Sequence, residues 1–309
     1  MATMYDLIII GGGPAGVSAG IYAARKKMNT LLITDSLGGQ SVVSADIQNW
    51  IGTPSISGFD LAKNLEAHLR AQQGIEIVDD DRVVAMQKKD DGTFFLGTKG
   101  GKKYEAKYIL LVSGSSRKKL GIPGEAAFEG RGVVYCSICD APLFGDKTVA
   151  VVGGGNSALE SVIDLIPYAS KIYLMVRSEV LKGDPVTQEK IKANPKVEIL
   201  WNAVPQEIVG KDVVTSIKYQ DAKSGEAKEL TLDGVFVEIG LVPNSDFAKN
   251  LVERDPYGAV KVDARTQATS CPGIWAAGDV TDALYKQNNT SAGDAIKAVL
   301  NVYDHLKKQ

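Results

Sequence analysis

The chain has 309 residues, of which 44% are hydrophobic and 23% charged, a composition typical of a folded globular protein of about two domains. Its 35 basic and 37 acidic residues give a net charge of -2, which excludes the strongly basic surface that nucleic acid or an anionic membrane requires. The first apolar run follows no basic region and is too short for a signal peptide or a spanning helix, so we expect a cytoplasmic protein.

The first part of the chain predicts a strand, a helix and a second strand. Residues 6–10 form an apolar run that ends at a glycine, residues 15–26 are rich in alanine, and residues 30–33 are again apolar. This succession is typical of a parallel βαβ unit. We therefore expect a helix that connects two neighbouring parallel strands.

The turn between this first strand and the helix is rich in glycine. Gly11, Gly13 and Gly16 match the spacing Gly-x-Gly-x-x-Gly. Such a turn lets the backbone approach a pyrophosphate, to which the helix N-terminus offers free N–H groups and partial positive charge. The turn therefore predicts a bound dinucleotide, and Asp35, one position later than usual, is the candidate ligand of its ribose.

The same pattern returns in the middle of the chain. Residues 148–152 predict a strand, a helical segment follows to about residue 168, and residues 171–175 predict the next strand. A region rich in strand patterns comes after each βαβ unit, at residues 75–112 and again at residues 197–239. The simplest interpretation is two similar modules in one chain.

The second module has its own glycine turn. Gly153, Gly155 and Ala158 repeat the spacing, with alanine tolerated at the third position. Two such turns predict two bound dinucleotides. Where a ribose-binding acid would be expected, the strand ends at Val176, which cannot bind a ribose hydroxyl, and Arg177, which could pair with a 2'-phosphate or stack on adenine.

The last segment, from about residue 244, is too short for a third domain. It predicts one strand at 273–277 and a terminal helix from about Ala292, which must complete one of the two modules. We therefore predict an α/β fold with two Rossmann-like three-layer nucleotide-binding domains. The expected domains are a discontinuous one of residues 1–117 and 245–309, and a continuous one of residues 118–244.

Two of the three cysteines, Cys136 and Cys139, form a C-x-x-C pair. This spacing permits an exchangeable disulfide and often lowers a thiol pKa. The alternative is half of a zinc site, but zinc needs four ligands, and Cys271, His68 and His305 form no second pair. We predict a redox-active disulfide and no metal.

Asp140 directly follows the second cysteine. It could exchange protons with the thiolate leaving group during dithiol–disulfide interchange, and the alternative is a solvated turn carboxylate. Cys271 is expected to be a small buried side chain rather than a reactive thiol. His68 and His305 are expected at the surface, so hydrolase chemistry has no histidine base.

The chain carries one glycine turn before Cys136-Ser-Ile-Cys-Asp140 and a second one after it. In this order of motifs it resembles the low-molecular-weight thioredoxin reductases, which are flavin disulfide reductases. The resemblance covers essentially the whole chain. Further matching pieces are Gly38-Gly-Gln40, Asn49-Trp50, Gly153-Gly-Gly-Asn-Ser-Ala-Leu-Glu160, Gly240-Leu-Val-Pro-Asn244, Gly278-Asp-Val280 and Tyr285-Lys-Gln287 with Ser291-Ala-Gly293.

The resemblance implies a position for each cofactor. FAD would be bound in the first domain by Gly11, Gly13, Pro14, Ala15, Gly16, Gly39, Gln40, Asn49, Asp279 and Gln287, and we add Gly114 from the crossing between the domains. NADH or NADPH would be bound in the second domain by Gly153, Gly155, Asn156, Ser157, Ala158, Glu160 and Gly240. The family also implies a homodimer and a rotation of the cysteine-bearing domain.

The sequence departs from the family at two places, the nicotinamide-binding run after residue 175 and the pair Asn288-Asn289. NADPH-using members carry His-Arg-Arg and a further Arg where this chain has Val176-Arg-Ser-Glu-Val-Leu-Lys182, which leaves only Arg177 and Lys182 for a 2'-phosphate. Residues 230–244 and the pair Asn156-Ser157 resemble more closely the alkyl hydroperoxide reductase flavoprotein, whose members favour NADH. Asn288-Asn289 stand where apolar residues are usual beside the flavin.

The function that these features predict is electron transfer from a nicotinamide cofactor through FAD and the Cys136–Cys139 disulfide to a protein disulfide. Thioredoxin or a thioredoxin-like protein is the expected acceptor, and Asp140 would protonate the leaving thiolate. The alternatives are a ferredoxin-dependent thioredoxin reductase, a dithiol oxidase that reacts with oxygen, and a flavin-bound redox-sensing module without turnover.

Overall fold

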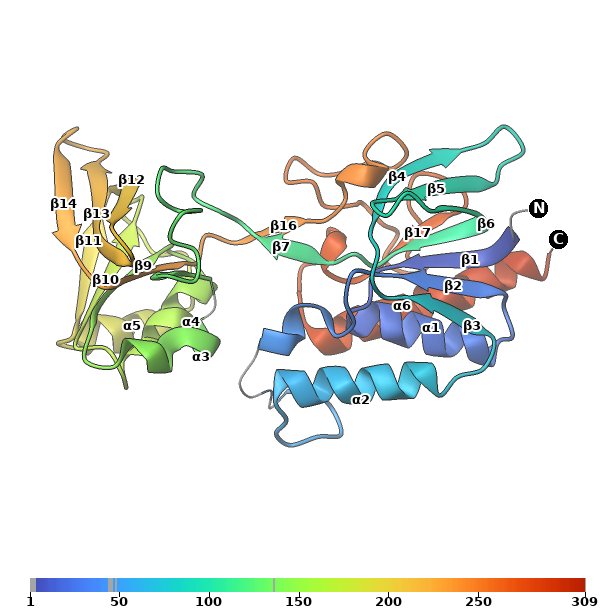
Figure 1. Cartoon of the computed structure of the whole chain (residues 1–309), viewed down its shortest axis with the longest axis horizontal. Coiled ribbons are helices and arrows are strands. Elements are labelled where there is room, and N and C mark those ends of the chain that lie inside the picture. The colour runs from blue at the N-terminus through green and yellow to red at the C-terminus, as the bar shows by residue number, and fades with distance from the viewer. Residues whose placement is uncertain (1–3, 44–46, 48, 136, 309) are drawn as a thin grey trace. The chain divides into compact units, whose positions relative to one another are not determined.

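The computed structural model describes residues 4–43, 47, 49–135 and 137–308 (Figure 1). They divide into two compact units. Unit 1 consists of Met1–Ser116 together with Val242–Gln309, and unit 2 consists of Arg117–Leu241. Unit 1 is thus built from two separate stretches of the chain, and unit 2 from the stretch between them.

Unit 1 is built on a seven-stranded sheet with the order β3-β2-β1-β6-β5-β4, in which β17 also pairs with β6. Strands β3, β2, β1, β6 and β17 run parallel, whereas β5 is antiparallel to both β4 and β6. The strands are β1 Met4–Ile10, β2 Thr30–Ile33, β3 Ile75–Val78, β4 Val83–Lys88, β5 Phe94–Thr98, β6 Lys103–Leu111 and β17 Ile274–Ala276.

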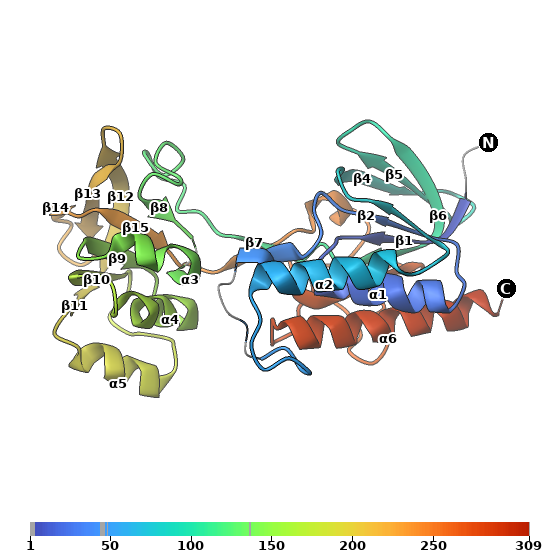
Figure 2. The same cartoon turned by 60° about the horizontal axis from the view of Figure 1, so that its bottom comes forward.

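Three helices cover one face of this sheet (Figure 2). They are α1 Pro14–Arg25, α2 Gly58–Arg70 and α6 Asn288–Leu306, and α1 contacts both of the others. Leu7 and Ile9 of β1 pack in the core beneath these helices, while Ile8 and Ile10 pack in a second core on the opposite face. Burial on both faces explains why β1 is an unbroken apolar run rather than an alternating one.

Unit 2 has three layers. A parallel sheet with the order β11-β10-β9-β15-β8 lies between the helices and an antiparallel sheet with the order β12-β13-β14. The helices are α3 Ser137–Asp140, α4 Asn156–Leu165 and α5 Pro185–Ala193. The strands are β8 Val133–Val134, β9 Thr148–Val152, β10 Lys171–Val176, β11 Val197–Trp201, β12 Ala203–Gly210, β13 Val214–Asp221, β14 Ala227–Thr231 and β15 Gly234–Val237.

Two short strands connect the units and pair with each other. They are β7 Ser115–Arg117 and β16 Leu241–Pro243. On the side of unit 1, the N–H of Asn244 donates to the carbonyl of Gly114 at 2.9 Å. On the side of unit 2, the N–H of Lys118 donates to the carbonyl of Gly240 at 2.9 Å. The outgoing and returning segments are therefore hydrogen-bonded at both ends.

The predicted α/β fold with parallel sheets and two Rossmann-like units is confirmed. Two helix ends differ from expectation. Helix α4 ends at Leu165, because Ile166 to Tyr168 form turns. Helix α6 begins at Asn288 rather than about Ala292, since a capping box between Gln287 and Thr290 satisfies its first backbone N–H groups.

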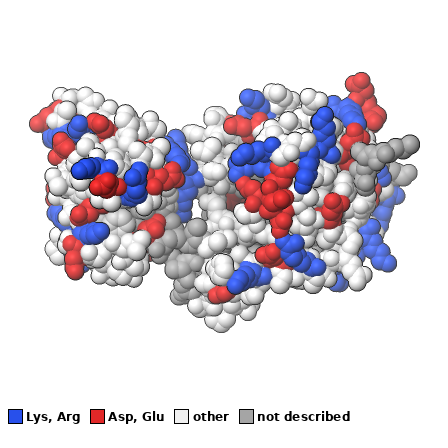
Figure 3. Space-filling model, viewed as in Figure 1, with Lys and Arg blue, Asp and Glu red and all other residues white. Residues whose placement is uncertain are grey.

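Charge is distributed evenly over the face of the molecule that Figure 3 displays. Lys and Arg side chains lie interspersed with Asp and Glu in both units, and no broad basic patch is visible on that face. Within the described part of the chain, no helix has the length and apolar character needed to cross a membrane.

Candidate functional site

The glycine turn of unit 1 requires glycine for steric reasons. Gly11 has a φ of +123°, and a Cβ there would lie 2.2 Å from the carbonyl oxygen of Val112. A Cβ at Gly16 would lie 1.9 Å from the carbonyl oxygen of Gly11, and one at Gly39 would lie 2.9 Å from the Cα of Gly13. The backbone of the turn is therefore packed closely against β6, α1 and the segment that begins at Gly39.

The N-terminus of α1 is left open to a ligand. Its N-cap is Gly13, which supplies no side-chain cap, and the same holds for Gly155 at the start of α4. In contrast, α2 and α5 are capped by the side chains of Ser57 and Asp184. First-turn N–H groups have no partner inside a helix, so the two helices after the glycine turns offer donors and partial positive charge to an anion.

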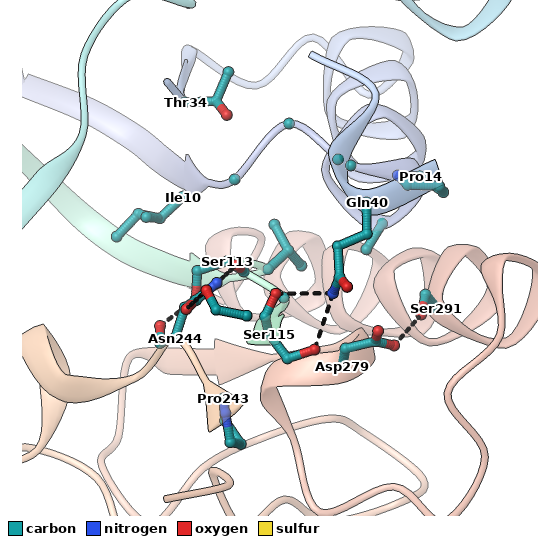
Figure 4. Close-up of a pocket in the computed structure, with 18 of the residues that line it drawn as sticks. Ile10, Pro14, Thr34, Gln40, Ser113, Ser115, Pro243, Asn244, Asp279 and Ser291 are labelled. Carbon is teal, nitrogen blue, oxygen red and sulfur yellow. Dashed lines mark hydrogen bonds between the residues drawn. The ribbon is translucent and has the colours of Figure 1, made fainter. Parts of the chain in front are cut away.

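A cavity of about 470 Å³ opens at this helix N-terminus (Figure 4). Its volume lies in the range of about 300–1,000 Å³ that is usual for small-molecule sites. It is lined by residues from the glycine turn, the end of β2, η1 Gly39–Val43, the end of β6, residues 242–247 and the segment from β17 to the start of α6. All of these residues belong to unit 1.

Two of the lining residues, Asp35 and Arg82, pair with each other. The Nε of Arg82 donates to Oδ2 of Asp35 at 3.0 Å, and its Nη2 reaches the same oxygen. Asp35 follows β2, where a ribose-binding acid is expected. Its side chain is half exposed, so it remains accessible to a ribose.

Another part of the cavity wall is a hydrogen-bonded set of polar side chains (Figure 4). The Nε2 of Gln40 donates to the carbonyl and the Oγ of Ser115, at 2.8 and 3.0 Å. Ser291 donates to Oδ1 of Asp279 at 3.2 Å. Lys286 donates to the carbonyls of Asp279 and Thr281, and its burial lowers its pKa.

Most of the sequence-predicted residues of unit 1 line this cavity. They are Gly11, Gly13, Pro14, Ala15, Asp35, Gly39, Gln40, Gly114, Asp279 and Gln287. Gly16 does not line the cavity and packs against the carbonyl of Gly11. Asn49 does not line it either, but it donates to Oε1 of Gln287 at 3.2 Å. Further lining residues, for which no cofactor role was predicted, are Arg82, Ser115, Asn244, Lys286 and Ser291.

The missed residues differ in how well the sequence signals them. Ser115 follows the predicted Gly114, and Lys286 lies within the matching piece Tyr285-Lys-Gln287, so both could have been identified from their neighbours. Arg82 offers no such signal. It is a charged residue just before β4, and only the folding of unit 1 brings it to Asp35, 47 residues earlier in the chain.

The glycine turn of unit 2 has one sterically required glycine and one open position. A Cβ at Gly153 would lie 2.2 Å from the carbonyl oxygen of Glu238 and 2.8 Å from the Cβ of Ala158. At Gly155 a Cβ would meet no protein atom within 4 Å. Protein packing therefore does not require glycine at position 155, and the open space there would allow close approach of a pyrophosphate.

The other predicted residues of unit 2 surround this turn or follow neighbouring strands. Asn156 Oδ1 accepts from the N–H of Asp184 at 2.7 Å, and Ser157 is exposed in the first turn of α4. Arg177 is exposed after β10 and has no hydrogen-bond or ion-pair partner in the described part of the chain. Gly240 has a φ of +103° and open space around its Cβ position.

Unit 2 also carries carboxyl groups with raised pKa values. Burial raises the pKa of Glu238 to about 7, Arg117 opposes that shift, and Asp164 and Glu160 add to it. Burial and the nearby Asp164 raise the pKa of Glu160, and burial raises that of Asp164 as well. These groups hold protons more readily than exposed carboxylates do.

The predicted cysteine pair is only partly within the described residues. Cys136 lies outside them, and Cys139 belongs to α3. Asp140 ends this helix, and its burial raises its pKa. The Oγ of Ser137 donates to Oδ2 of Asp164 at 2.7 Å, so the cysteine-bearing helix is tied to α4.

The third cysteine and the two histidines lie apart from these groups. Cys271 is a partly buried free thiol packed against the core of unit 1. His68 and His305 are both exposed. Among the described residues, no group of three or more His, Cys, Asp or Glu side chains could hold a metal ion.

The residues that are present fit two dinucleotides. Each unit has a glycine turn, an uncapped helix N-terminus and a parallel sheet whose carboxyl edge meets that turn. The sequence matches the pyridine nucleotide-disulphide oxidoreductase family over residues 5–299, and the chain therefore belongs to this family.

Individual relatives indicate which members of this family the chain is similar to. The chain is 40% identical over 304 residues to an alkyl hydroperoxide reductase subunit of Pseudomonas putida, and 39% identical over 302 residues to a protein of Bacillus subtilis called NADH dehydrogenase. Each match covers 98% of this chain and 58% of the relative, so the chain spans less than two thirds of these curated relatives. The solved thioredoxin reductase of Lactococcus lactis is similar with a TM-score of 0.87 and 32% identity, over 99% of this chain and 100% of that one.

These findings define the kind of enzyme. The chain is a thioredoxin reductase-like, FAD-dependent disulfide oxidoreductase, and its cofactors are FAD and NAD(P)H.

Proposed function

We propose that the chain transfers electrons from NADH or NADPH, through FAD bound in unit 1, to the Cys136–Cys139 disulfide, and from there to a protein disulfide. Thioredoxin or a thioredoxin-like protein is the proposed acceptor. The solved relative named above is a thioredoxin reductase, and its chain is matched along its whole length. The domains that FAD and the nicotinamide would occupy are part of this proposal.

One observation carries the proposal. The cysteine-bearing helix α3 and the glycine turn before α4 belong to the same compact unit, and the Ser137–Asp164 hydrogen bond joins α3 to α4. A unit that binds the nicotinamide thus also carries the disulfide. At the start of α4, packing does not require glycine at Gly155, and no side chain caps the helix. A pyrophosphate would contact this open position and the free N–H groups beside it.

The electrons and protons of the proposed reaction balance. The nicotinamide gives up one hydride, and the disulfide takes up two electrons and two protons to become two thiols. Bound FAD would supply the two-electron relay between them. One proton must therefore come from solvent or from an acid of the protein. Asp140 adjoins Cys139, and its raised pKa suits it to protonate the leaving thiolate.

An anaerobic titration tests the electron donor. The purified flavoprotein would be mixed separately with NADH and NADPH, and the flavin absorbance followed. We expect rapid bleaching with one of the two, which identifies the donor. A flavin that dithionite bleaches but that neither NADH nor NADPH bleaches would overturn the proposed donor. It would favour the ferredoxin-dependent or the dithiol-oxidase alternative.

A cysteine substitution tests the acceptor step. Cys139→Ser is expected to abolish NAD(P)H-dependent reduction of thioredoxin while leaving flavin bleaching by the nucleotide intact. Cys271→Ser, at the partly buried thiol of unit 1, is the matched control and should reduce thioredoxin normally. Full thioredoxin reduction by Cys139→Ser would overturn the role of the pair, and a wild-type enzyme that reduces no protein disulfide at all would favour the sensing module.

A further inference from the structure

The strand order of unit 2 determines where a bound dinucleotide crosses the sheet. From β9 the chain proceeds to β10 and β11 on one side, whereas β15 and β8 lie on the other side of β9. The order therefore reverses between β9 and β15. In open parallel sheets, ligands bind outside the carboxyl ends of the strands at this reversal.

The residues at these two strand ends are Gly153 and Glu238. Val152 and Val237 are register partners in the β9–β15 pair, and the N–H of Glu238 donates to the carbonyl of Val152 at 2.9 Å. The adenosine half of a dinucleotide lies beside the second strand of the βαβ unit, which is β10 here. The nicotinamide half of the dinucleotide must then extend from the glycine turn toward the end of β15, which Glu238 directly follows.

Glu238 is a buried carboxyl with one partner. Its side chain is 5% exposed, and Nη1 of Arg117 donates to its Oε2 at 3.0 Å. The Arg117 side chain is 36% exposed, so the guanidinium is the accessible end of the pair. Both residues belong to unit 2.

The pair leaves hydrogen-bonding capacity unused. Oε1 of Glu238 has no hydrogen-bond partner among the described residues, and it is not fully sealed from solvent. Arg117 makes no other hydrogen bond to the described residues, so its further N–H donors are also available. An acceptor that is nearly buried and unpaired is unfavourable unless a ligand or water supplies a donor.

We propose that Arg117 and Glu238 recognise the carboxamide of the nicotinamide ring, with Arg117 donating to its carbonyl oxygen and Oε1 of Glu238 accepting from its NH2 group. This inference rests on the proposed function, because it requires that unit 2 binds a nicotinamide cofactor. A carboxamide presents an acceptor and two donors side by side, and the free groups of the pair complement both. The pair thus discriminates the ring substituent, whereas the glycine turn binds the pyrophosphate, which every such dinucleotide shares.

Calorimetric binding measurements on the FAD-loaded protein test this assignment. At pH 8, where the Glu238 carboxyl is ionised and Oε1 can accept, NAD⁺ and NADP⁺ would be titrated into wild type, Glu238→Ala and Arg117→Ala. ADP-ribose and its 2'-phosphate form, which lack the nicotinamide, serve as paired probes. For the dinucleotide that wild type binds, we expect affinity to fall roughly tenfold or more in each variant, as for a lost hydrogen bond to a charged group. Affinity for the matching ADP-ribose should stay within about twofold, because those contacts lie at the turn and at β10.

A second probe needs no variant. The 3-acetylpyridine analogue replaces the NH2 group of the carboxamide with a methyl group, so it cannot donate to Glu238. Wild type should bind it several-fold more weakly than the natural dinucleotide, and Glu238→Ala should bind the two about equally. Glu207→Ala removes a glutamate that pairs with Lys218 in the antiparallel sheet, and it is the matched control that should behave as wild type.

Each outcome decides the proposal. Unchanged dinucleotide affinity in both variants would overturn it, as would equal losses for the dinucleotide and ADP-ribose, which indicate a general disturbance of unit 2. The same affinity of wild type for the analogue and the natural dinucleotide would also overturn it. If wild type binds neither dinucleotide and neither bleaches the flavin, the proposed function fails as well, so the two failures are distinguishable.

Discussion

A methyl group added at Gly155 would contact a bound ligand but no atom of the protein, so its effect reports on ligand binding rather than on packing. The Cβ position of Gly155 is empty, and its φ of -98° suits any residue. We therefore expect Gly155→Ala to leave the thermal unfolding midpoint unchanged while weakening nicotinamide-dinucleotide binding roughly tenfold or more, because the methyl group would displace the pyrophosphate. Calorimetry and thermal unfolding measure the two effects separately.

The comparison variant is Gly153→Ala. Its methyl group would clash with the carbonyl of Glu238 at a φ of +152°, so both folding of the turn and binding should suffer. Loss of stability in Gly155→Ala, or dinucleotide binding equal to that of wild type, would contradict the interpretation of this turn.

Glu238 should make stability depend on pH. Its pKa is about 7 in the folded protein and ordinarily 4.5, so between these values the folded state keeps a proton that the unfolded state loses. The folded state is therefore progressively disfavoured as pH rises through this window, by at most about 3 kcal/mol above pH 7. We expect the unfolding midpoint of wild type, relative to that of Glu238→Gln, to fall between pH 5 and pH 8.

The control for this experiment is Glu207→Gln, whose carboxylate is paired with Lys218 at the surface. Its midpoint relative to wild type should change little over the same pH range. A constant difference between wild type and Glu238→Gln would show that Glu238 titrates normally.

Asp140 provides a test of proton transfer. Burial raises the pKa of its carboxyl, which favours a protonated acid next to Cys139. Asp140→Asn is expected to slow thioredoxin reduction roughly a hundredfold or more, the usual contribution of a general acid. Flavin bleaching by the nicotinamide should keep its rate, and stopped-flow absorbance can measure the two steps separately. Slower bleaching, or an unchanged rate of thioredoxin reduction, would contradict this role of Asp140.

Among the secondary-structure elements, α6 has a start that depends on one hydroxyl. The N–H of Gln287 donates to Oγ1 of Thr290 at 3.2 Å, and Gln287, Asn288 and Ser291 all line the cavity of unit 1. Thr290→Ala should cost about 1 kcal/mol and lower the unfolding midpoint, because the cap is lost. It should also weaken FAD retention, measured by dialysis.

Thr290→Ser keeps the hydroxyl and is the control. It should retain both the midpoint and the flavin. A Thr290→Ala protein as stable as wild type would mean that the capping box does not determine where α6 begins.

The sequence predicted the elements that local patterns define. The strand, glycine turn and helix of each unit were recognisable because their residues are contiguous and the spacing of the glycines is fixed by sterics, as the contacts of Gly11, Gly16 and Gly153 demonstrate. Helix α6 was placed too late, since Asn288 and Asn289 have low helix propensity and the capping residues are unusual.

The polar contacts between distant segments could not be predicted in this way. Arg82 reaches Asp35, Gln40 reaches Ser115, and Arg117 reaches Glu238 only through the pairing and packing of strands far apart in the chain. A single sequence carries no local signal for such pairs. The hydrogen bond between Ser137 and Asp164 belongs to the same group.

For the whole molecule, the family resemblance predicts a homodimer. Light scattering of the FAD-loaded protein is expected to give twice the mass of the 32.9 kDa chain. The measurement should be made over a range of protein concentrations, because assembly follows mass action. A mass equal to one chain at all concentrations would rule the dimer out.

The hydrogen-bonded strands β7 and β16 make unit 2 an insertion with adjacent ends. Gly114 and Asn244 are bonded on one side of the strand pair, and Lys118 and Gly240 on the other. A peptide of very few residues could therefore rejoin unit 1, and residues 117–241 could be excised as one continuous polypeptide. In evolutionary terms, a gene fragment encoding one nucleotide-binding module could enter or leave the gene of the other without leaving a long gap to close.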